Sequence, residues 1–326
     1  MTSPLLPDRD KLQICFAHAA YQLGDEFSAR NTGMRHFEVR DLGELQARIG
    51  EADVLVVSGL WRNELLERAG RLRFIQSVSA GTDQYARDLL RAKGVRLASA
   101  QGANERAVAE HAIALILALE RQLPQARDNQ ASRTWRGMIA NRSRREDELG
   151  GKTLVIVGLG RIGSRVAMLA RAFGMRVIGI RRSAGAAPDA VDAVVGPDRL
   201  LEVLPDADFV ALTCPLTPET EGLIGAPQLS AMKRSAYLIN VARGRVVDEA
   251  AMLSALQDGR IAGAGLDCFH DEPLPTSSPF WGFANVLITP HTAGETRRYE
   301  SNVVDLLLDN LERLFSGNPA LRNEIV

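Results

Sequence analysis

The chain has 326 residues, of which 46% are hydrophobic and 24% charged, and its formal net charge is −1. This length allows two domains with separate cores, and the charge balance excludes a strongly basic surface for nucleic acid or an anionic membrane. Cys15, Cys214 and Cys268 lack metal-ligand and CxxC spacing, so we expect no metal site and a reduced, cytoplasmic setting. The N-terminus lacks a signal-peptide pattern, and no apolar run approaches the roughly 20 residues of a membrane helix.

Residues 1 to about 103 alternate short apolar runs with helix-like stretches, which predicts a parallel sheet with helices on its faces. The expected strands are Leu12–Phe16, Asp53–Ser58, Phe74–Val78 and Val95–Ala98, and the expected helices are Glu64–Ala69 and Gln84–Lys93.

A long helix is predicted from Asn104 to about Glu120. Residues 128–149 are polar, and their basic run Arg142–Arg145 is cancelled by an acidic one, which favours a solvated connection. Trp135 within it needs a packing partner, for which a second subunit is a candidate.

A second α/β series begins at Gly151, and the tail 296–315 has helical periodicity. The expected strands are Thr153–Val157, Arg176–Ile180, Asp208–Thr213, Ala236–Asn240, Gly263–Phe269 and Val286–Thr289, and the expected helices are Ile162–Phe173, Arg199–Leu204, Pro227–Met232 and Asp248–Gln257.

The pattern GxGxxG lies between the expected strand Thr153–Val157 and the helix that follows it. Gly158 allows a tight turn, Gly160 lets a pyrophosphate approach the backbone, and Gly163 lets helix and strand pack closely. The pattern therefore predicts a dinucleotide site; the alternative is a glycine-rich structural turn.

The residues after the next strand indicate which dinucleotide is bound. A site that prefers NAD usually has an acid there, but this chain reads Arg181-Arg182-Ser183. Two arginines would pair with a 2′-phosphate, so we expect NADP(H) to be preferred. Alternatively, both arginines are solvated strand-end charges and NAD(H) also serves.

Three polar residues, Arg243, Glu272 and His291, each follow an expected strand end beside a turn residue. Each alone has an ordinary structural explanation. Since ligands bind at the carboxyl ends of parallel strands, the three together suggest a site that binds a 2-oxo acid and transfers a proton.

The other histidines are weaker candidates. His111 lies within the helix beginning near Asn104 and is expected to pack or to form a structural hydrogen bond. His18 and His36 have no matching partner, and His270 should point away from Glu272.

From about Phe74 to Gly294 the chain resembles the D-isomer-specific 2-hydroxyacid dehydrogenases, among them the glyoxylate/hydroxypyruvate reductases. The segments that carry this resemblance are Ser79–Asp83, Val108–His111, Gly158–Gly163, Asn240–Gly244 with Val246–Glu249, Gly265–Asp267 with Glu272-Pro273, and Thr289–His291.

The resemblance implies roles for individual residues. Arg243, Glu272 and His291 would be catalytic, and the substrate would contact Ser79, Ala80, Gly81, Asn104 and Arg243. The cofactor would contact Gly158, Gly160, Arg161, Ile162, Gly163, Arg181, Arg182, Ser183, Cys214, Val241, Ala242, Asp267, His291 and Gly294.

The resemblance also implies two Rossmann-like α/β domains with parallel sheets. A flavodoxin-like substrate domain would comprise residues 1–103 plus 294–326, with a dinucleotide-binding domain, 104–293, inserted in it. Residues 104–150 would form the dimerisation region of a homodimer.

Three comparisons with the family pattern disfavour particular activities within it. Glu272 disfavours formate dehydrogenases, which have Gln there, and Ser79–Gly81 lacks the Lys of phosphite dehydrogenases. The chain continues for only about 35 residues beyond His291, so the regulatory domain of many phosphoglycerate dehydrogenases is not expected.

The expected activity is reduction of a small 2-oxo acid to the D-2-hydroxy acid, with glyoxylate and hydroxypyruvate as first candidates, since related enzymes with that activity often prefer NADPH. Two alternatives stay open: a non-catalytic, cofactor-sensing scaffold like the family's corepressors, and a dehydrogenase of the same fold that acts on a non-carboxylate substrate.

Overall fold

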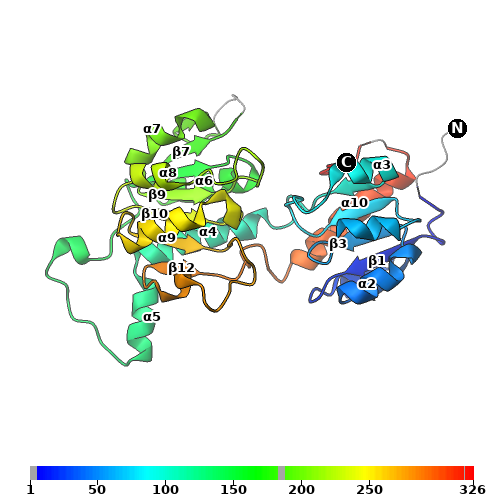
Figure 1. The fold of residues 1–326 in the computed structure, drawn as a ribbon, viewed down its shortest axis with the longest axis horizontal. Helices are drawn as coiled ribbons and strands as arrows, with labels where there is room; N and C mark the ends of the chain where they lie inside the picture. Colours follow the sequence, from blue (N-terminus) through cyan, green and yellow to red (C-terminus); the bar gives the residue numbers. More distant parts are fainter. Residues whose placement is uncertain (1–5, 183–187, 319) are drawn as a thin grey trace. The chain divides into compact units, whose positions relative to one another are not determined.

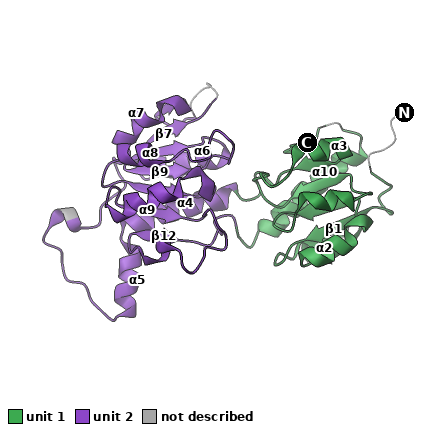
Figure 2. Ribbon diagram, viewed as in Figure 1, with its two compact units in different colours: residues 1–104, 295–326 green, residues 105–294 purple. Residues whose placement is uncertain are grey.

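The structure is a computed structural model that describes residues 6–182, 188–318 and 320–326. The chain divides into two compact units (Figure 2). Unit 1 comprises Met1–Asn104 and Glu295–Val326, and unit 2 comprises Glu105–Gly294.

Unit 1 is built around a five-stranded sheet in which every strand pairs in parallel with its neighbours (Figure 1). The strand order β2-β1-β3-β4-β5 is that of flavodoxin-like folds. The strands are β1 (Gln13–Ala17), β2 (Arg35–Val39), β3 (Val54–Val57), β4 (Phe74–Ser77) and β5 (Arg96–Ala98). The helices are α1 (Leu23–Ser28), α2 (Leu42–Arg48), α3 (Arg87–Lys93) and α10 (Tyr299–Phe315).

The C-terminal helix α10 joins unit 1 because one of its faces is apolar. Val303, Leu307 and Leu311 are buried and share a core cluster with Leu23 and Phe27 of α1. The predicted one-sided helix in the tail is therefore confirmed.

Unit 2 has a seven-stranded parallel sheet of order β12-β11-β10-β9-β6-β7-β8. Its strands are β6 (Thr153–Val157), β7 (Arg176–Ile180), β8 (Ala193–Val195), β9 (Phe209–Leu212), β10 (Tyr237–Asn240), β11 (Gly263–Leu266) and β12 (Val286–Ile288). Its helices are α4 (Glu105–Glu120), α5 (Leu123–Ala131), α6 (Arg161–Ala172), α7 (Leu200–Val203), α8 (Ala226–Ala231) and α9 (Glu249–Gln257). Helix α4 packs on the sheet beside α6 through an apolar face that includes Ala112 and Ile116.

Several elements differ from the sequence-based expectation. The stretch predicted as a helix at Glu64–Ala69 is a 3₁₀ helix over Asn63–Glu67. Strand β2 was not predicted because it is only partly buried at the sheet edge, and β8 because it has three residues. Helices α1 and α2 are short and were not predicted either.

The polar stretch 128–149, expected to be a solvated connection, begins within a helix. Residues 128–131 are the end of α5, whose nine residues are all described and of which none is buried. Beyond α5 the side chains of Trp135 and Met138 are 97% and 102% exposed. In the parts of the chain that the structure describes, no helix has the length and apolar character needed to cross a membrane.

Candidate active site

The three residues proposed to be catalytic follow three neighbouring strands of unit 2. Arg243 comes after β10, Glu272 after β11 and His291 after β12. Since β10 pairs with β11 and β11 with β12, all in parallel, these chain segments leave the sheet at the same edge.

The turn after β10 is fixed by a buried asparagine and by a glycine. Asn240 donates from Nδ2 to the carbonyl oxygen of Arg243 (3.0 Å) and accepts at Oδ1 from the N–H of Ala242 (3.0 Å). A Cβ at Gly244 would lie 2.0 Å from the carbonyl carbon of Phe269, so only glycine fits there. The turn that contains Arg243 therefore packs directly against the segment that leads to Glu272.

Glu272 and His291 form a hydrogen-bonded pair. Oε2 of Glu272 lies 2.7 Å from Nδ1 of His291, and Oε1 accepts from the N–H of Phe269 at 3.0 Å. Burial raises the pKa of Glu272, but the hydrogen bonds from His291 and Phe269 and the charges of His291 and Arg243 outweigh it and lower the pKa overall.

This pairing defines what the histidine can do. Because the lowered pKa keeps Glu272 ionised near neutral pH, its carboxylate accepts the Nδ1 proton and fixes the ring orientation. Nε2 is then the ring nitrogen that can exchange a proton with another molecule.

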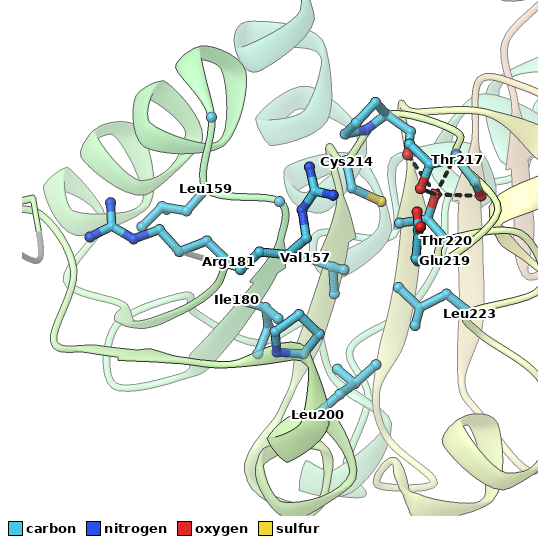
Figure 3. Close-up of a pocket in the computed structure, with 15 residues that line it drawn as sticks. Val157, Leu159, Ile180, Arg181, Leu200, Cys214, Thr217, Glu219, Thr220 and Leu223 are labelled. Atoms are coloured by element: carbon cyan, nitrogen blue, oxygen red, sulfur yellow. Dashed lines mark hydrogen bonds between the residues drawn. The ribbon is translucent and has the colours of Figure 1, made fainter. Parts of the chain in front are cut away.

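A cavity of about 410 Å³ lies at the other half of this sheet edge (Figure 3). It is bordered by the segments after β6, β7 and β9, where the strand order reverses, which is the usual place for ligands in open α/β sheets. Figure 3 shows Leu159 and Arg181 on one side of the cavity, and Cys214, Thr217 and Thr220 on the other.

The glycines at this edge fit a dinucleotide. Gly158 has a φ of +103°, and a Cβ there would lie 2.5 Å from the N of Cys214; at Gly163 a Cβ would lie 2.2 Å from the carbonyl oxygen of Gly158. At Gly160 a Cβ would meet no described atom within 4 Å, which leaves room for a pyrophosphate before α6 begins at Arg161.

Five of the predicted cofactor residues line this cavity: Gly158, Gly160, Arg181, Arg182 and Cys214. The predicted Ser183 lies outside the described residues. Ile162 and Gly163 belong to α6, and Arg161 lines a separate shallow cavity with Ser164 and Arg165.

Sequence reasoning missed the wall of the cavity that follows β9. Thr217, Glu219 and Thr220 belong to it, and Glu219 places an exposed carboxylate in the same cavity as the two arginines. A sequence signal existed, because these residues follow a predicted strand end, but the position of β9 beside β6 is needed to use it.

The remaining predicted cofactor residues lie near His291 in the chain or follow neighbouring strands. Val241 and Ala242 are buried after β10, and Asp267 is buried after β11. Gly294 ends unit 2. His111 forms the structural hydrogen bond expected of it, with Nε2 3.0 Å from Oγ1 of Thr289.

The predicted substrate residues Ser79, Ala80, Gly81 and Asn104 belong to unit 1. The carbonyl oxygen of Ser79 accepts hydrogen bonds from Ser77 (3.1 Å) and from the N–H of Ala100 (3.0 Å), which fixes the turn after β4. Oδ1 of Asn104 is buried and has no hydrogen-bond partner among the described residues. An unpaired buried oxygen is costly, so this position suits a ligand group that donates a hydrogen bond.

Comparison with known protein families gives a match that lies within unit 2. The family model for the D-isomer specific 2-hydroxyacid dehydrogenase NAD-binding domain matches residues 113–293. The chain belongs to the D-isomer specific 2-hydroxyacid dehydrogenase family. Members of this family are oxidoreductases that bind a nicotinamide cofactor.

Relatives within the family differ in their names. Glyoxylate/hydroxypyruvate reductase B of Escherichia fergusonii is 39% identical over 78% of this chain and 78% of its own length. D-3-phosphoglycerate dehydrogenase of Methanocaldococcus jannaschii is 35% identical over 85% of this chain. The chain spans about half, 52%, of the length of that dehydrogenase.

A solved relative has the same fold over almost the whole chain. The NADPH-dependent glyoxylate/hydroxypyruvate reductase from Sinorhizobium meliloti, in complex with NADP and malonate, superposes with a TM-score of 0.81 and 26% identity. The match covers 97% of this chain and 97% of the other, so the two-sheet α/β fold is that of the family.

Proposed function

We propose that this protein reduces a small 2-oxo acid to the D-2-hydroxy acid with NADPH. The observation that carries the proposal is the 2.7 Å His291–Glu272 pair, which lies on the same sheet edge as the cavity lined by Gly158 and Gly160. Glyoxylate and hydroxypyruvate are the proposed substrates, and the names of the relatives support them.

Each residue of the trio has a separate task. Arg243 would bind the substrate carboxylate and polarise the carbonyl, because its planar guanidinium matches both groups. His291 would donate the Nε2 proton to the carbonyl oxygen as that oxygen gains negative charge. Glu272 would hold the ring and stabilise its charged form until the transfer. A bound nicotinamide supplies the hydride.

In unit 1, the turn Ser79–Gly81 would bind a carboxylate through the backbone N–H groups of Ala80 and Gly81. Among the described residues neither of these N–H groups donates a hydrogen bond to another backbone group, which leaves both able to bind an anion. Asn104 would accept a hydrogen bond from the substrate at its buried Oδ1.

The preference for NADPH would come from Arg181 and Arg182. Both line the cavity at the end of β7, where enzymes that prefer NAD usually have an acid. A charge-assisted hydrogen bond contributes roughly 1.5–3 kcal/mol, so one such contact to a 2′-phosphate corresponds to about ten- to hundredfold in affinity. We propose NADP(H) as the preferred cofactor and NAD(H) as a weaker one.

The decisive experiment is a panel of 2-oxo acids assayed with NADPH and with NADH. We expect the highest kcat/KM for glyoxylate or hydroxypyruvate with NADPH and a D product by chiral chromatography. Cofactor binding without reduction of any 2-oxo acid would instead favour a cofactor-sensing scaffold or a non-carboxylate substrate. A strong preference for NADH would contradict the role given to the arginines.

We also propose that the protein is a homodimer and that it works in the cytoplasm. The exposed Trp135 and Met138 after α5 are the apolar side chains that a second copy would cover, and the cysteines are free thiols. Light scattering should give the mass of a dimer, and Trp135→Ser should lower it towards that of one chain. A monomeric wild type would contradict the proposal.

A further inference from the structure

A buried carboxylate holds the chain on the C-terminal side of His291. Asp267, directly after β11, is 2% exposed. Its Oδ1 accepts from the N–H of Thr292 and its Oδ2 from the N–H of Ala293, each at 3.0 Å. The two residues that follow His291 are therefore bound to one rigid group of the neighbouring strand.

The same carboxylate holds the chain on the N-terminal side of His291. The hydroxyl of Thr289 donates to Oδ1 of Asp267 at 2.6 Å. A hydroxyl has one proton, so towards His111, whose Nε2 lies 3.0 Å away, Oγ1 of Thr289 must act as the acceptor. Nε2 of His111 therefore carries a proton and donates it, which fixes the rotation of the threonine hydroxyl.

The chain between these anchors has an unfavourable backbone conformation. His291 has a φ of +54°, in the left-handed region that residues other than glycine seldom adopt. Such a conformation persists where surrounding contacts determine it. Here the contacts at Thr289, Thr292 and Ala293 do so, and the ring of His291 is thereby presented to Glu272.

We propose that His111 and Thr289 are positioning residues that act through Asp267 to hold His291 in its reactive orientation. This inference rests on the proposed function only for the role of His291 in catalysis. The side chains of both residues bond elsewhere than to the Glu272–His291 pair in the described part of the chain, while the carbonyl oxygen of Thr289 accepts from the N–H of His291 at 3.0 Å. Each side chain acts through the next: His111 orients the hydroxyl of Thr289, and Thr289 with Asp267 fixes the segment that carries His291.

The test uses pairs of variants in the full-length protein. Thr289→Val keeps the shape of the side chain but removes the hydroxyl, and His111→Leu keeps an apolar contact but removes the donor. Thr289→Ser and His111→Gln restore the hydroxyl and a donor near the position of Nε2. His270→Leu is the matched control, because it removes another histidine of unit 2, one whose Nε2 contacts the carbonyl oxygen of Val247.

The first readout needs no substrate: hydrogen exchange of the amides of Thr292 and Ala293. We expect exchange at least about tenfold faster in Thr289→Val and His111→Leu, with wild-type rates in the restoring variants and in His270→Leu, since these amides lose a fixed acceptor. Unchanged exchange at both amides would overturn the inference. Faster exchange throughout unit 2 would also overturn it, since it would indicate a general packing role.

The second readout is steady-state kinetics. A displacement of about 1 Å can lower a rate about a hundredfold, so we expect kcat to fall roughly ten- to hundredfold in Thr289→Val, more than the KM for NADPH rises. The double variant His111→Leu/Thr289→Val should be no slower than Thr289→Val, because both act in one chain of contacts. Additive losses would overturn the proposed order of action.

The two readouts separate this inference from the proposed function. If exchange responds as expected but the wild type reduces no 2-oxo acid, the positioning network stands and the proposed reaction fails. If the wild type is active and Thr289→Val retains its full kcat, the inference fails and the reaction stands. Should His111→Leu not fold, Thr289→Val still decides the matter.

Discussion

Polar residues are held differently at the two halves of the sheet edge in unit 2. After β10, β11 and β12 they are bound to the fold, with Asn240 and Asp267 buried beneath the turns and Glu272 bonded to His291. After β6, β7 and β9, charged side chains line an open cavity, with Arg182 and Glu219 exposed.

This difference matches the two tasks proposed for the sheet edge: proton transfer after β10, β11 and β12, and choice of cofactor after β6, β7 and β9. A proton donor must stay in place to within fractions of an ångström, and hydrogen bonds to buried groups achieve this. A phosphate is recognised by charge, and exposed side chains can do that without a rigid frame. We therefore expect substitutions after β10, β11 and β12 to lower kcat strongly. Substitutions after β6, β7 and β9 should change the preference between NADPH and NADH by smaller, graded amounts.

The largest effect should come from His291→Ala. Proton transfer by a positioned side chain contributes about 10²–10⁴-fold, so kcat for 2-oxo acid reduction should fall by that factor while the Kd for NADPH changes little. Stopped-flow measurement of NADPH consumption and fluorescence titration of NADPH check the two quantities. His270→Ala is the control; a near-normal kcat in His291→Ala would remove the histidine from the mechanism.

The next effect should come from Arg181→Asp. This change places an acid where a 2′-phosphate would bind, so the ratio of kcat/KM for NADPH to that for NADH should fall at least about tenfold. Arg176→Asp changes an arginine at the other end of β7 and should leave the ratio unaltered. Equal ratios in Arg181→Asp and wild type would show that Arg181 is a solvated charge.

The same comparison explains what sequence could predict. The trio and the glycines could be proposed from sequence because strand ends and GxGxxG are local patterns. The parallel α/β fold could be predicted because alternating apolar runs are also a local pattern. The wall with Glu219 was missed because it requires the strand order β6–β9. The link from His111 to Asp267 joins residues far apart in sequence, so no local pattern could reveal it. The edge strand β2 lacks a continuous buried run, so periodicity gave no signal.

A smaller effect is expected from Glu219→Gln. Glu219 is exposed in the cavity that Arg182 lines, and its pKa is lowered by hydrogen bonds to Thr217 and its own backbone and by the charge of Arg182. Removing its charge should favour a 2′-phosphate, raising the NADPH/NADH ratio of kcat/KM by at most about fivefold, as for exposed charge pairs, and less at high salt. Glu221→Gln is the control. A lower ratio would mean that Glu219 serves to hold Arg182.

The smallest effect concerns stability and pH. The pKa of Glu272 in the folded protein lies below its ordinary value of 4.5, so the unfolded chain takes up a proton at higher pH than the folded one. The contribution of Glu272 to the free energy of unfolding is therefore present above about pH 5 and is lost as the pH falls through 4.5 and below.

Urea unfolding of wild type and Glu272→Gln between pH 3.5 and pH 7 tests this sign. The difference in unfolding free energy should be largest at the upper end and shrink towards pH 3.5. In a His291→Gln background the same pH dependence should be weaker, because the hydrogen bond from His291 is the largest of the contacts that lower the pKa of Glu272. A difference that grows on acidification would mean that burial, which raises the pKa, dominates at Glu272, and the pair would then not hold a carboxylate at neutral pH as securely as its 2.7 Å distance indicates.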